Sequence, residues 1–154
     1  MNFTKRLILF LIINFGGLAL GGWLMANGPG SSWYLQLNQA PWTPPGWVFG
    51  FAWTSIMICF SIYLAFLFGQ IKTMHLNLIY AFQVFLNVIW NYVFFNRHLI
   101  AIGLIVIVLL TFVIFYLFFR YKSEQMQQIR WLLMPYMLWL CIASSLNAYI
   151  LIHN

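Results

Sequence analysis

Acidic side chains are almost missing from this sequence. Among 154 residues, Glu124 is the single carboxylate side chain, and only 5% of the residues are charged, against about a quarter in a water-soluble domain. One carboxylate cannot supply the acid and base of a glycosidase, an intramembrane Ser–His–Asp triad, or an acidic cage for Mg²⁺ or Ca²⁺. It also argues against a proton-coupled transporter built on buried acids.

Cysteine and histidine are scarce as well. Cys59 and Cys141 lie within apolar runs, which is typical of small buried hydrophobes and not of a disulfide or metal framework. His75, His98 and His153 lie near the ends of the expected helices, so the sequence favours neither axial haem ligation within the bundle nor a His–Cys zinc site. We therefore expect no metal site and no required cofactor.

Apolar and aromatic residues are abundant instead. Hydrophobic residues make up 64% of the chain, which contains 8 Trp and 16 Phe. A helix needs about 20 mostly apolar residues to cross a bilayer, and five such runs occupy approximately residues 7–26, 47–69, 76–95, 99–119 and 131–152. Open strands cannot span lipid, and the runs lack the alternation of a β-barrel. The sequence predicts an all-α, integral membrane bundle of five transmembrane helices, with residues 1–154 as a single domain.

The first run has a second possible interpretation. Lys5 and Arg6 precede an apolar stretch, as in a signal peptide. The stretch continues far enough to span the bilayer, which favours a retained helix. Within it, Gly17 and Gly21 form a Gly-x-x-x-Gly pattern that lets another helix approach closely, in the same chain or in a second copy.

The connections between the runs differ in length and charge. Residues 27–46 form the only long connection; it is uncharged, rich in Gly and Pro, and carries Trp33, Tyr34 and Trp42. We expect it to fold back as a lid on the bundle end or to lie at the membrane interface. Six of the seven Lys and Arg residues lie on the side of the amino terminus, and only Arg97 lies on the other.

This asymmetry predicts the topology. Positive residues stay on the cytoplasmic side, so we expect a cytoplasmic amino terminus, with the long first loop and the carboxyl terminus outside. The same rule accounts for the net charge of +6, and we expect no nucleic-acid partner.

Polar and aromatic residues share faces on three of the expected helices. The third helix aligns Gln83, Asn87, Trp90 and Asn91. The fifth aligns Tyr136, Trp139, Ala143, Leu146 and Asn147 beyond Pro135, which favours a kink; the second offers Trp47, Gly50, Trp53, Thr54 and Met57. Such a row either bonds helices together or lines a pocket. An apolar, aromatic-walled cavity is suited to a large planar ligand.

Three motifs along the chain resemble one family. The first is Trp33-Tyr34 with Pro41-Trp42-Thr43-Pro44-Pro45-Gly46-Trp47-Val48-Phe49-Gly50 and Trp53; the second is Gln83-x-x-Leu86-Asn87-x-x-Trp90 with Phe94-Phe95; the third is Pro135-Tyr136-x-x-Trp139-x-x-x-Ala143-x-x-Leu146-Asn147. Together they are similar to the translocator protein family, also called the peripheral benzodiazepine receptor or tryptophan-rich sensory protein family (TspO/MBR), and most closely to its bacterial type. The resemblance covers nearly the whole chain.

The resemblance implies a membrane protein, here of the bacterial plasma membrane, with five helices and commonly a homodimer. It implies binding of porphyrins such as protoporphyrin IX, and of synthetic isoquinoline carboxamide and benzodiazepine ligands. Matched by motif position, the ligand-binding residues are Trp47, Phe49, Trp53, Asn87, Trp90, Trp139, Ala143 and Leu146. Some bacterial members are reported to promote light- and oxygen-dependent porphyrin breakdown through pocket tryptophans, which correspond to Trp53 and Trp139.

The sequence departs from the animal members of the family in two places. The cholesterol pattern near the end of the fifth helix is incomplete, since no Lys or Arg follows Tyr149, and Ala148 replaces a Tyr. The start of the fourth helix lacks a Trp.

A carrier of porphyrin or of another apolar small molecule is the alternative function, and a purely structural membrane protein is the third possibility.

Overall fold

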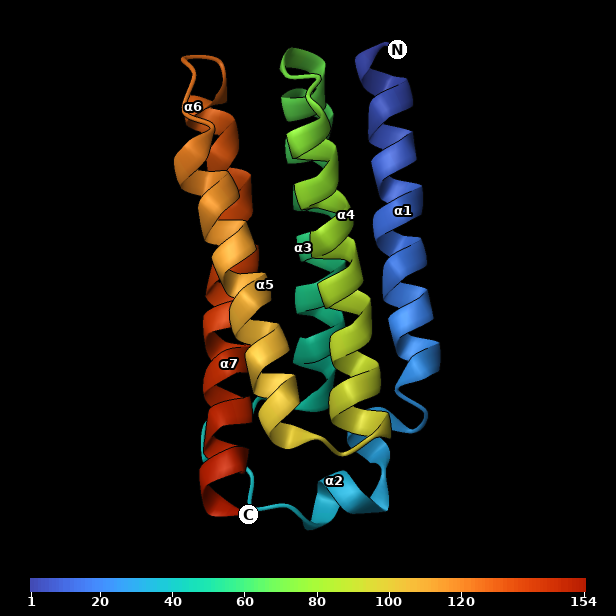
Figure 1. Cartoon of the computed structure of the whole chain (residues 1–154). Helices are drawn as coiled ribbons and strands as arrows, with labels where there is room; N and C mark the ends of the chain where they lie inside the picture. Colours follow the sequence, from blue (N-terminus) through green and yellow to red (C-terminus); the bar gives the residue numbers. More distant parts are fainter.

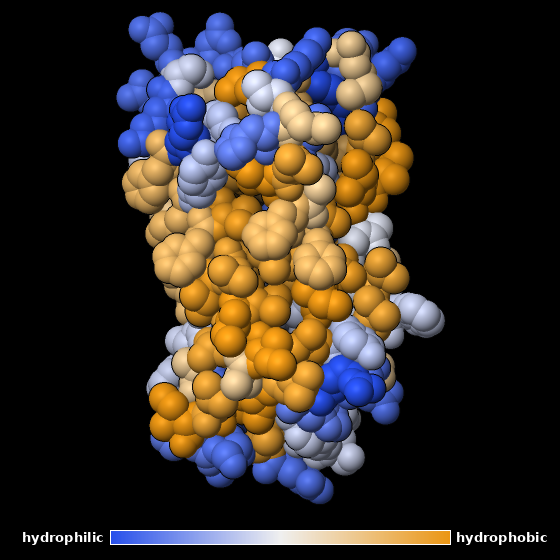
Figure 2. Space-filling view, in the orientation of Figure 1, coloured by the Kyte–Doolittle hydropathy of each residue, from blue (hydrophilic) through white to orange (hydrophobic).

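The computed structural model describes residues 1–154 as five long helices that lie side by side (Figure 1). They are α1 (Phe3–Leu24), α3 (Gly46–Gln70), α4 (Met74–Asn91), α5 (Ile100–Arg120) and α7 (Met134–His153). All five lie in segments long and apolar enough to cross a membrane. An apolar band occupies the middle of the molecule between more hydrophilic ends (Figure 2). The predicted all-α, five-helix integral membrane fold is confirmed.

Local sequence determines where several helices begin. The Asn2 side chain accepts a hydrogen bond from the Lys5 backbone N–H, and the Thr73 side chain accepts one from Leu76 N–H. These caps satisfy N–H groups that have no partner within the first turn. They also explain why α1 begins four residues before the predicted apolar run, because Lys5 and Arg6 extend the helix beyond its hydrophobic part.

Pro135 lies where a 3₁₀ stretch passes into the fifth helix. Because α7 begins at Met134, Pro135 lies in the first turn, where its missing N–H would have no helical partner. The residues before it form two short elements, α6 (Met126–Ile129) and the 3₁₀ turn η3 (Arg130–Leu133). The expected start of the fifth helix at residue 131 is therefore replaced by this tighter turn.

The third helix also ends differently from the prediction. After Asn91 the chain continues into a widened π turn, η2 (Tyr92–Asn96). Phe94 and Phe95 are both buried there, edge to face with ring centroids 4.9 Å apart. π turns are frequent at functional sites, and this one lies at the end of the molecule that contains the cavity described below.

The helices close into a ring. α1 packs against α3 and α4, α4 against α5, α5 against α7, and α3 against η3 and α7. The Gly-x-x-x-Gly face of α1 is used within the chain: Gly17 faces Val84 and Val88 of α4, and Gly21 faces Asn91. The close approach that the sequence left open is thus between two helices of the same protein.

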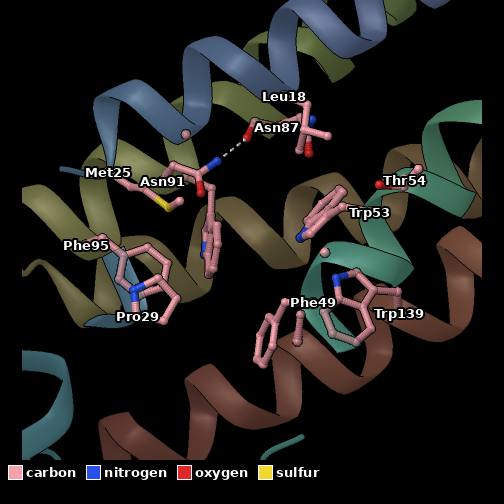
Figure 3. A pocket seen from close by; sticks show the side chains of 14 residues that line it. Leu18, Met25, Pro29, Phe49, Trp53, Thr54, Asn87, Asn91, Phe95 and Trp139 are labelled. Carbon is pink, nitrogen blue, oxygen red and sulfur yellow. Dashed lines mark hydrogen bonds between the residues drawn. The ribbon is translucent and has the colours of Figure 1, made fainter. Parts of the chain in front are cut away.

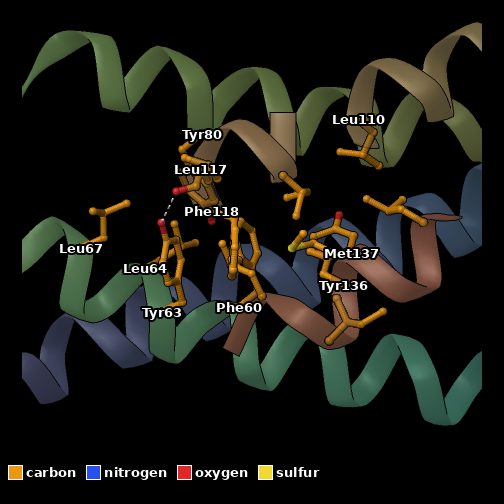
Figure 4. Close-up of a cluster of buried hydrophobic side chains, with 14 of the residues drawn as sticks. Phe60, Tyr63, Leu64, Leu67, Tyr80, Leu110, Leu117, Phe118, Tyr136 and Met137 are labelled. Carbon is orange, nitrogen blue, oxygen red and sulfur yellow. Dashed lines mark hydrogen bonds between the residues drawn. The ribbon is translucent and has the colours of Figure 1, made fainter. Parts of the chain in front are cut away.

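The half of the bundle next to the amino terminus is solid. Phe60, Tyr63, Leu64 and Tyr136 are almost completely buried within it (Figure 4). The Tyr63 hydroxyl donates a hydrogen bond to the Leu117 carbonyl, 3.1 Å away. Both cavities described below lie in the other half of the bundle.

Residues 27–46 cross the end of the bundle where the carboxyl terminus lies (Figure 1). They contain the 3₁₀ turn η1 (Gly28–Gly30) and the short helix α2 (Ser32–Gln36). Trp33 stacks on His98 with ring centroids 4.0 Å apart, and Trp42 Nε1–H donates to Ser145 Oγ at 3.1 Å. The segment is therefore attached to the α4–α5 connection and to α7.

Candidate functional site

A cavity of about 350 Å³ lies in the half of the bundle that residues 27–46 cross, and we call these residues the lid (Figure 3). Its volume falls in the range of small-molecule sites, about 300–1,000 Å³. Residues from four long helices, η1 and η2 line it: Leu18, Gly22, Met25, Pro29, Phe49, Gly50, Trp53, Thr54, Asn87, Trp90, Asn91, Phe95, Trp139 and Ala143. We call this space the main cavity.

Aromatic rings form one wall of the main cavity. Phe49 and Trp139 pack edge to face with ring centroids 5.1 Å apart, and Trp53 lies 6.5 Å from Trp139 in a similar arrangement. Figure 3 shows these three rings gathered on one side, across from Asn91, Phe95 and Pro29. Tilted rings of this kind present both faces and edges, so they can contact a flat ligand from more than one direction.

A polar strip from α4 borders the same space. Asn91 Nδ2–H donates to the Asn87 carbonyl at 3.1 Å, the Tyr136 hydroxyl donates to Asn87 Oδ1 at 3.3 Å, and Gln83 Nε2–H donates to the Tyr136 hydroxyl at 2.9 Å. The two roles expected for this polar row, bonding helices together and lining a pocket, therefore each apply to part of it. Gln83 and Asn87 bond α4 to α7, while Asn87 and Asn91 also line the cavity.

The main cavity has no ionisable lining residue. Its exposed polarity comes from amide, hydroxyl and indole groups. Trp90 and Trp139 each bury an indole Nε1–H that has no hydrogen-bond partner in the protein. Because an isolated charge is very costly in such surroundings, the cavity is suited to the neutral, apolar body of a ligand.

Six of the eight predicted ligand-binding residues come together here. Phe49, Trp53, Asn87, Trp90, Trp139 and Ala143 line the main cavity. Leu146 instead lines a smaller space of about 30 Å³, which we call the side chamber; it shares Phe49, Trp90, Phe95 and Ala143 with the main cavity. The predicted catalytic pair, Trp53 and Trp139, lies side by side. Their roles stay predictions.

Trp47 is not placed with the others. It is 72% exposed and lines neither space. On α3, positions 49, 50, 53 and 54 face the cavity, whereas Trp47 and Phe51, four residues apart, share an outward face. The motif contains Trp47, but the helical period turns it away from the cavity.

The family resemblance implies a pocket among the first, second, third and fifth helices, but sequence reasoning identified no lining residue on α1. Leu18, Gly22 and Met25 line the main cavity, with Pro29 just beyond them. No polar or aromatic stripe marks this face of α1, so no pattern in the sequence could have identified it. Phe95 was also missed as a lining residue, because the π turn that positions it could not be predicted.

Comparison with known proteins supports the resemblance seen in the motifs. The model of the TspO/MBR family matches residues 9–153. The tryptophan-rich sensory protein of Cereibacter sphaeroides is 32% identical over 149 residues, covering 96% of this chain and 90% of the relative. Protein CrtK of Rhodobacter capsulatus is 32% identical over 127 residues, 77% of this chain and 76% of the relative. The tryptophan-rich protein TspO of Archaeoglobus fulgidus is 30% identical over 160 aligned positions, with coverage of 100% and 99%.

Proposed function

Since this chain belongs to the TspO/MBR family, we propose that it binds porphyrins, in particular protoporphyrin IX, in the main cavity and promotes their light- and oxygen-dependent degradation. Isoquinoline carboxamide and benzodiazepine ligands compete for the same space. The observation that carries the proposal is the uncharged cavity with Trp53, Trp139 and Trp90 in its lining. No resident cofactor is needed, because the porphyrin is itself the light-absorbing group.

The aromatic wall supports both parts of the proposal. Indole rings stack on flat conjugated systems, and the apolar lining favours burial of a planar ring. Indole is also readily oxidised. In our proposal dioxygen is the oxidant, and Trp53 and Trp139 are the oxidisable groups that touch the bound porphyrin. Asn87 and Trp90 orient the ring from the side of α4.

The first test is the absorption spectrum of purified protein with protoporphyrin IX, followed in light and in darkness. Saturable quenching of tryptophan fluorescence at micromolar porphyrin measures binding. We expect a product band that needs protein, light and dioxygen together. Porphyrin in empty detergent micelles is the control. A shifted but unchanging spectrum would indicate a binder or carrier, and flux across sealed proteoliposomes in the dark would then test transport.

Replacing the two tryptophans separates binding from degradation. We expect Trp53→Phe with Trp139→Phe to retain porphyrin binding, because phenyl rings still pack on the ligand, but to lose most of the light-driven decay. Trp23→Phe is the matched control, since Trp23 is exposed on α1 and lines neither space. Unchanged decay in the double variant would exclude these indoles as reactive groups.

We further propose a cytoplasmic amino terminus in a bacterial plasma membrane, and a homodimer. The distribution of Lys and Arg supports the orientation, and the family resemblance supports the dimer. Cross-linking in the native membrane, with a titration of expression level, measures whether two copies associate specifically.

A further inference from the structure

A series of aromatic rings connects the main cavity with the lid. Trp90, which lines the cavity, stacks on Phe94 of η2 with ring centroids 5.4 Å apart and an interplanar angle of 7°. Phe94 in turn packs edge to face against Trp33 of α2, with centroids 5.7 Å apart. The other face of the series ends at His98, on which Trp33 stacks. Packed rings therefore lead from the ligand space to the end of the bundle.

The two indoles of this series differ in their surroundings. Trp90 Nε1 is buried and has no hydrogen-bond partner in the protein. Trp33 is half-buried and its Nε1 is not enclosed; it lies on the lid, between the segments that are long enough to cross a membrane. An indole that has lost an electron becomes a neutral radical by releasing its N–H proton. Water can take that proton from Trp33, whereas Trp90 has no acceptor within reach.

Phe94 separates the two indoles without holding a charge itself. Its ring is 2% exposed, and a phenyl ring is much harder to oxidise than an indole, so an electron passes through it and does not reside on it. The other ring contact out of the cavity leads from Trp53 to Tyr136, with centroids 6.0 Å apart. That phenol is buried and hydrogen-bonded only to amide groups, which are too weakly basic to take its proton.

We propose that Trp90, Phe94 and Trp33 form an electron-transfer path that removes oxidising equivalents from the main cavity. The inference rests on the proposed photochemistry, which supplies the oxidant. The excited porphyrin gives one electron to dioxygen, which forms superoxide and a porphyrin radical cation. Trp90 reduces this cation, and Trp33 reduces Trp90 through Phe94. Trp33 then releases its N–H proton to water, so the lid has lost one electron and one proton, and no charge remains in the cavity.

The path protects the tryptophans that line the cavity, because an indole that stays oxidised there reacts with dioxygen. Trp33 does not touch the ligand space, so it acts through Trp90. Its role is to lose the electron where water and small reductants can reach the oxidised ring. The lid thus has a chemical task in addition to covering the cavity.

The test maps where tryptophan is oxidised. Purified protein with protoporphyrin IX is illuminated in air, and oxygenated tryptophans are located by peptide mass spectrometry, with a sample kept in darkness as the control. We expect Trp33 to be oxidised several-fold more than the three most exposed indoles, which are Trp23, Trp42 and Trp47. Trp42 is the closest comparison, because it lies on the same lid. Oxidation of Trp33 that does not exceed that of these three would overturn the proposal.

Phe94→Leu interrupts the path and keeps both indoles. We expect it to lower the oxidation of Trp33 several-fold and to leave that of Trp42 unchanged. Singlet oxygen that diffuses out of the cavity would oxidise Trp33 equally in both proteins, so the comparison distinguishes electron transfer from diffusion. Phe10→Leu is the matched control, because Phe10 is a buried ring that packs edge to face on Tyr80 in the solid half. Unchanged oxidation of Trp33 in Phe94→Leu would contradict the path.

Trp33→Phe keeps the test decisive if Phe94→Leu fails to fold. Without the final donor, oxidation of Trp90, Trp53 and Trp139 should rise several-fold, and the protein should lose its activity after fewer porphyrin molecules. The dissociation constant of protoporphyrin IX in darkness should stay close to that of the wild type, which separates loss of electron transfer from loss of the lid. Oxidation of the cavity indoles at the wild-type level would count against the path.

The outcomes distinguish this inference from the proposed function. Porphyrin decay in light together with Trp33 oxidation that is independent of Phe94 overturns the path alone. If the wild type binds porphyrin without degrading it, the proposed degradation fails, and the dependence of Trp33 oxidation on Phe94 still decides the path. If the wild type does not bind porphyrin, both proposals fail.

Discussion

At the residue scale, one hydroxyl organises the polar edge of the main cavity. The Tyr136 hydroxyl accepts from Gln83 and donates to Asn87. It thereby holds the Asn87 amide in place at the cavity and joins α4 to α7. The spacing of Gln83 and Asn87 on one face could be recognised in the sequence. Their shared partner could not, because it comes from a helix about fifty residues away.

Tyr136→Phe tests this role. The substitution leaves the Gln83 and Asn87 amides without their shared partner, so we expect a loss of stability of about 0.5–2 kcal/mol and weaker porphyrin binding. Thermal unfolding in detergent and fluorescence quenching measure the two effects. Tyr63→Phe is the control, because its hydroxyl bonds Leu117 in the solid half of the bundle. It should lower stability and leave porphyrin affinity unchanged; equal losses of affinity in both variants would contradict the assignment.

At the scale of elements, the cavity depends on how closely α1 approaches α4. Gly21 is buried, and a Cβ there would lie 2.7 Å from Asn91 Nδ2. Gly16, on the exposed side of the same helix, has nothing within 4 Å of a Cβ. The sequence pattern marks Gly21 as a position of close approach, and the packing shows that the partner is Asn91 of α4.

Gly21→Val should therefore separate α1 from α4 or push Asn91 into the cavity. We expect a cost of about 1–3 kcal/mol from overpacking, and a several-fold weaker affinity for protoporphyrin IX. Gly16→Val serves as the comparison and should change neither quantity appreciably. The readouts are the unfolding midpoint in detergent and the dissociation constant. Normal porphyrin affinity in Gly21→Val would show that this contact does not shape the site.

At the scale of the whole molecule, the charged side chains lie near the two ends of the bundle, most of them at one end, and not in its interior. The loops and terminus at one end carry six of the seven cationic residues. With one carboxylate in the chain, these cations make other contacts: Arg6 Nε–H donates to the Ala65 carbonyl at 2.9 Å, and the Arg130 guanidinium lies over the Phe118 ring. Orientation should follow from this asymmetry alone.

Cysteine accessibility tests the orientation. Gln36→Cys places a thiol on the lid, and Gln125→Cys places one in the polar connection before α6; both positions are exposed. The background carries Cys59→Ala and Cys141→Ala, which remove the native thiols. In intact cells, a membrane-impermeant maleimide should label position 36 at once and position 125 only after permeabilisation. The reverse pattern would invert the proposed topology.

The sequence by itself determined that this protein is a five-helix membrane bundle with three aromatic helix faces. Hydropathy and charge asymmetry act along the chain, so each segment carries its own signal whatever it packs against. The tertiary structure decided which of those faces meet. It turned Trp47 outward, brought the featureless face of α1 into the cavity, and left Asn147 without a partner. These outcomes depend on helix rotation and on the π turn after Asn91, which arise from packing between distant segments and leave no periodic signal in the sequence.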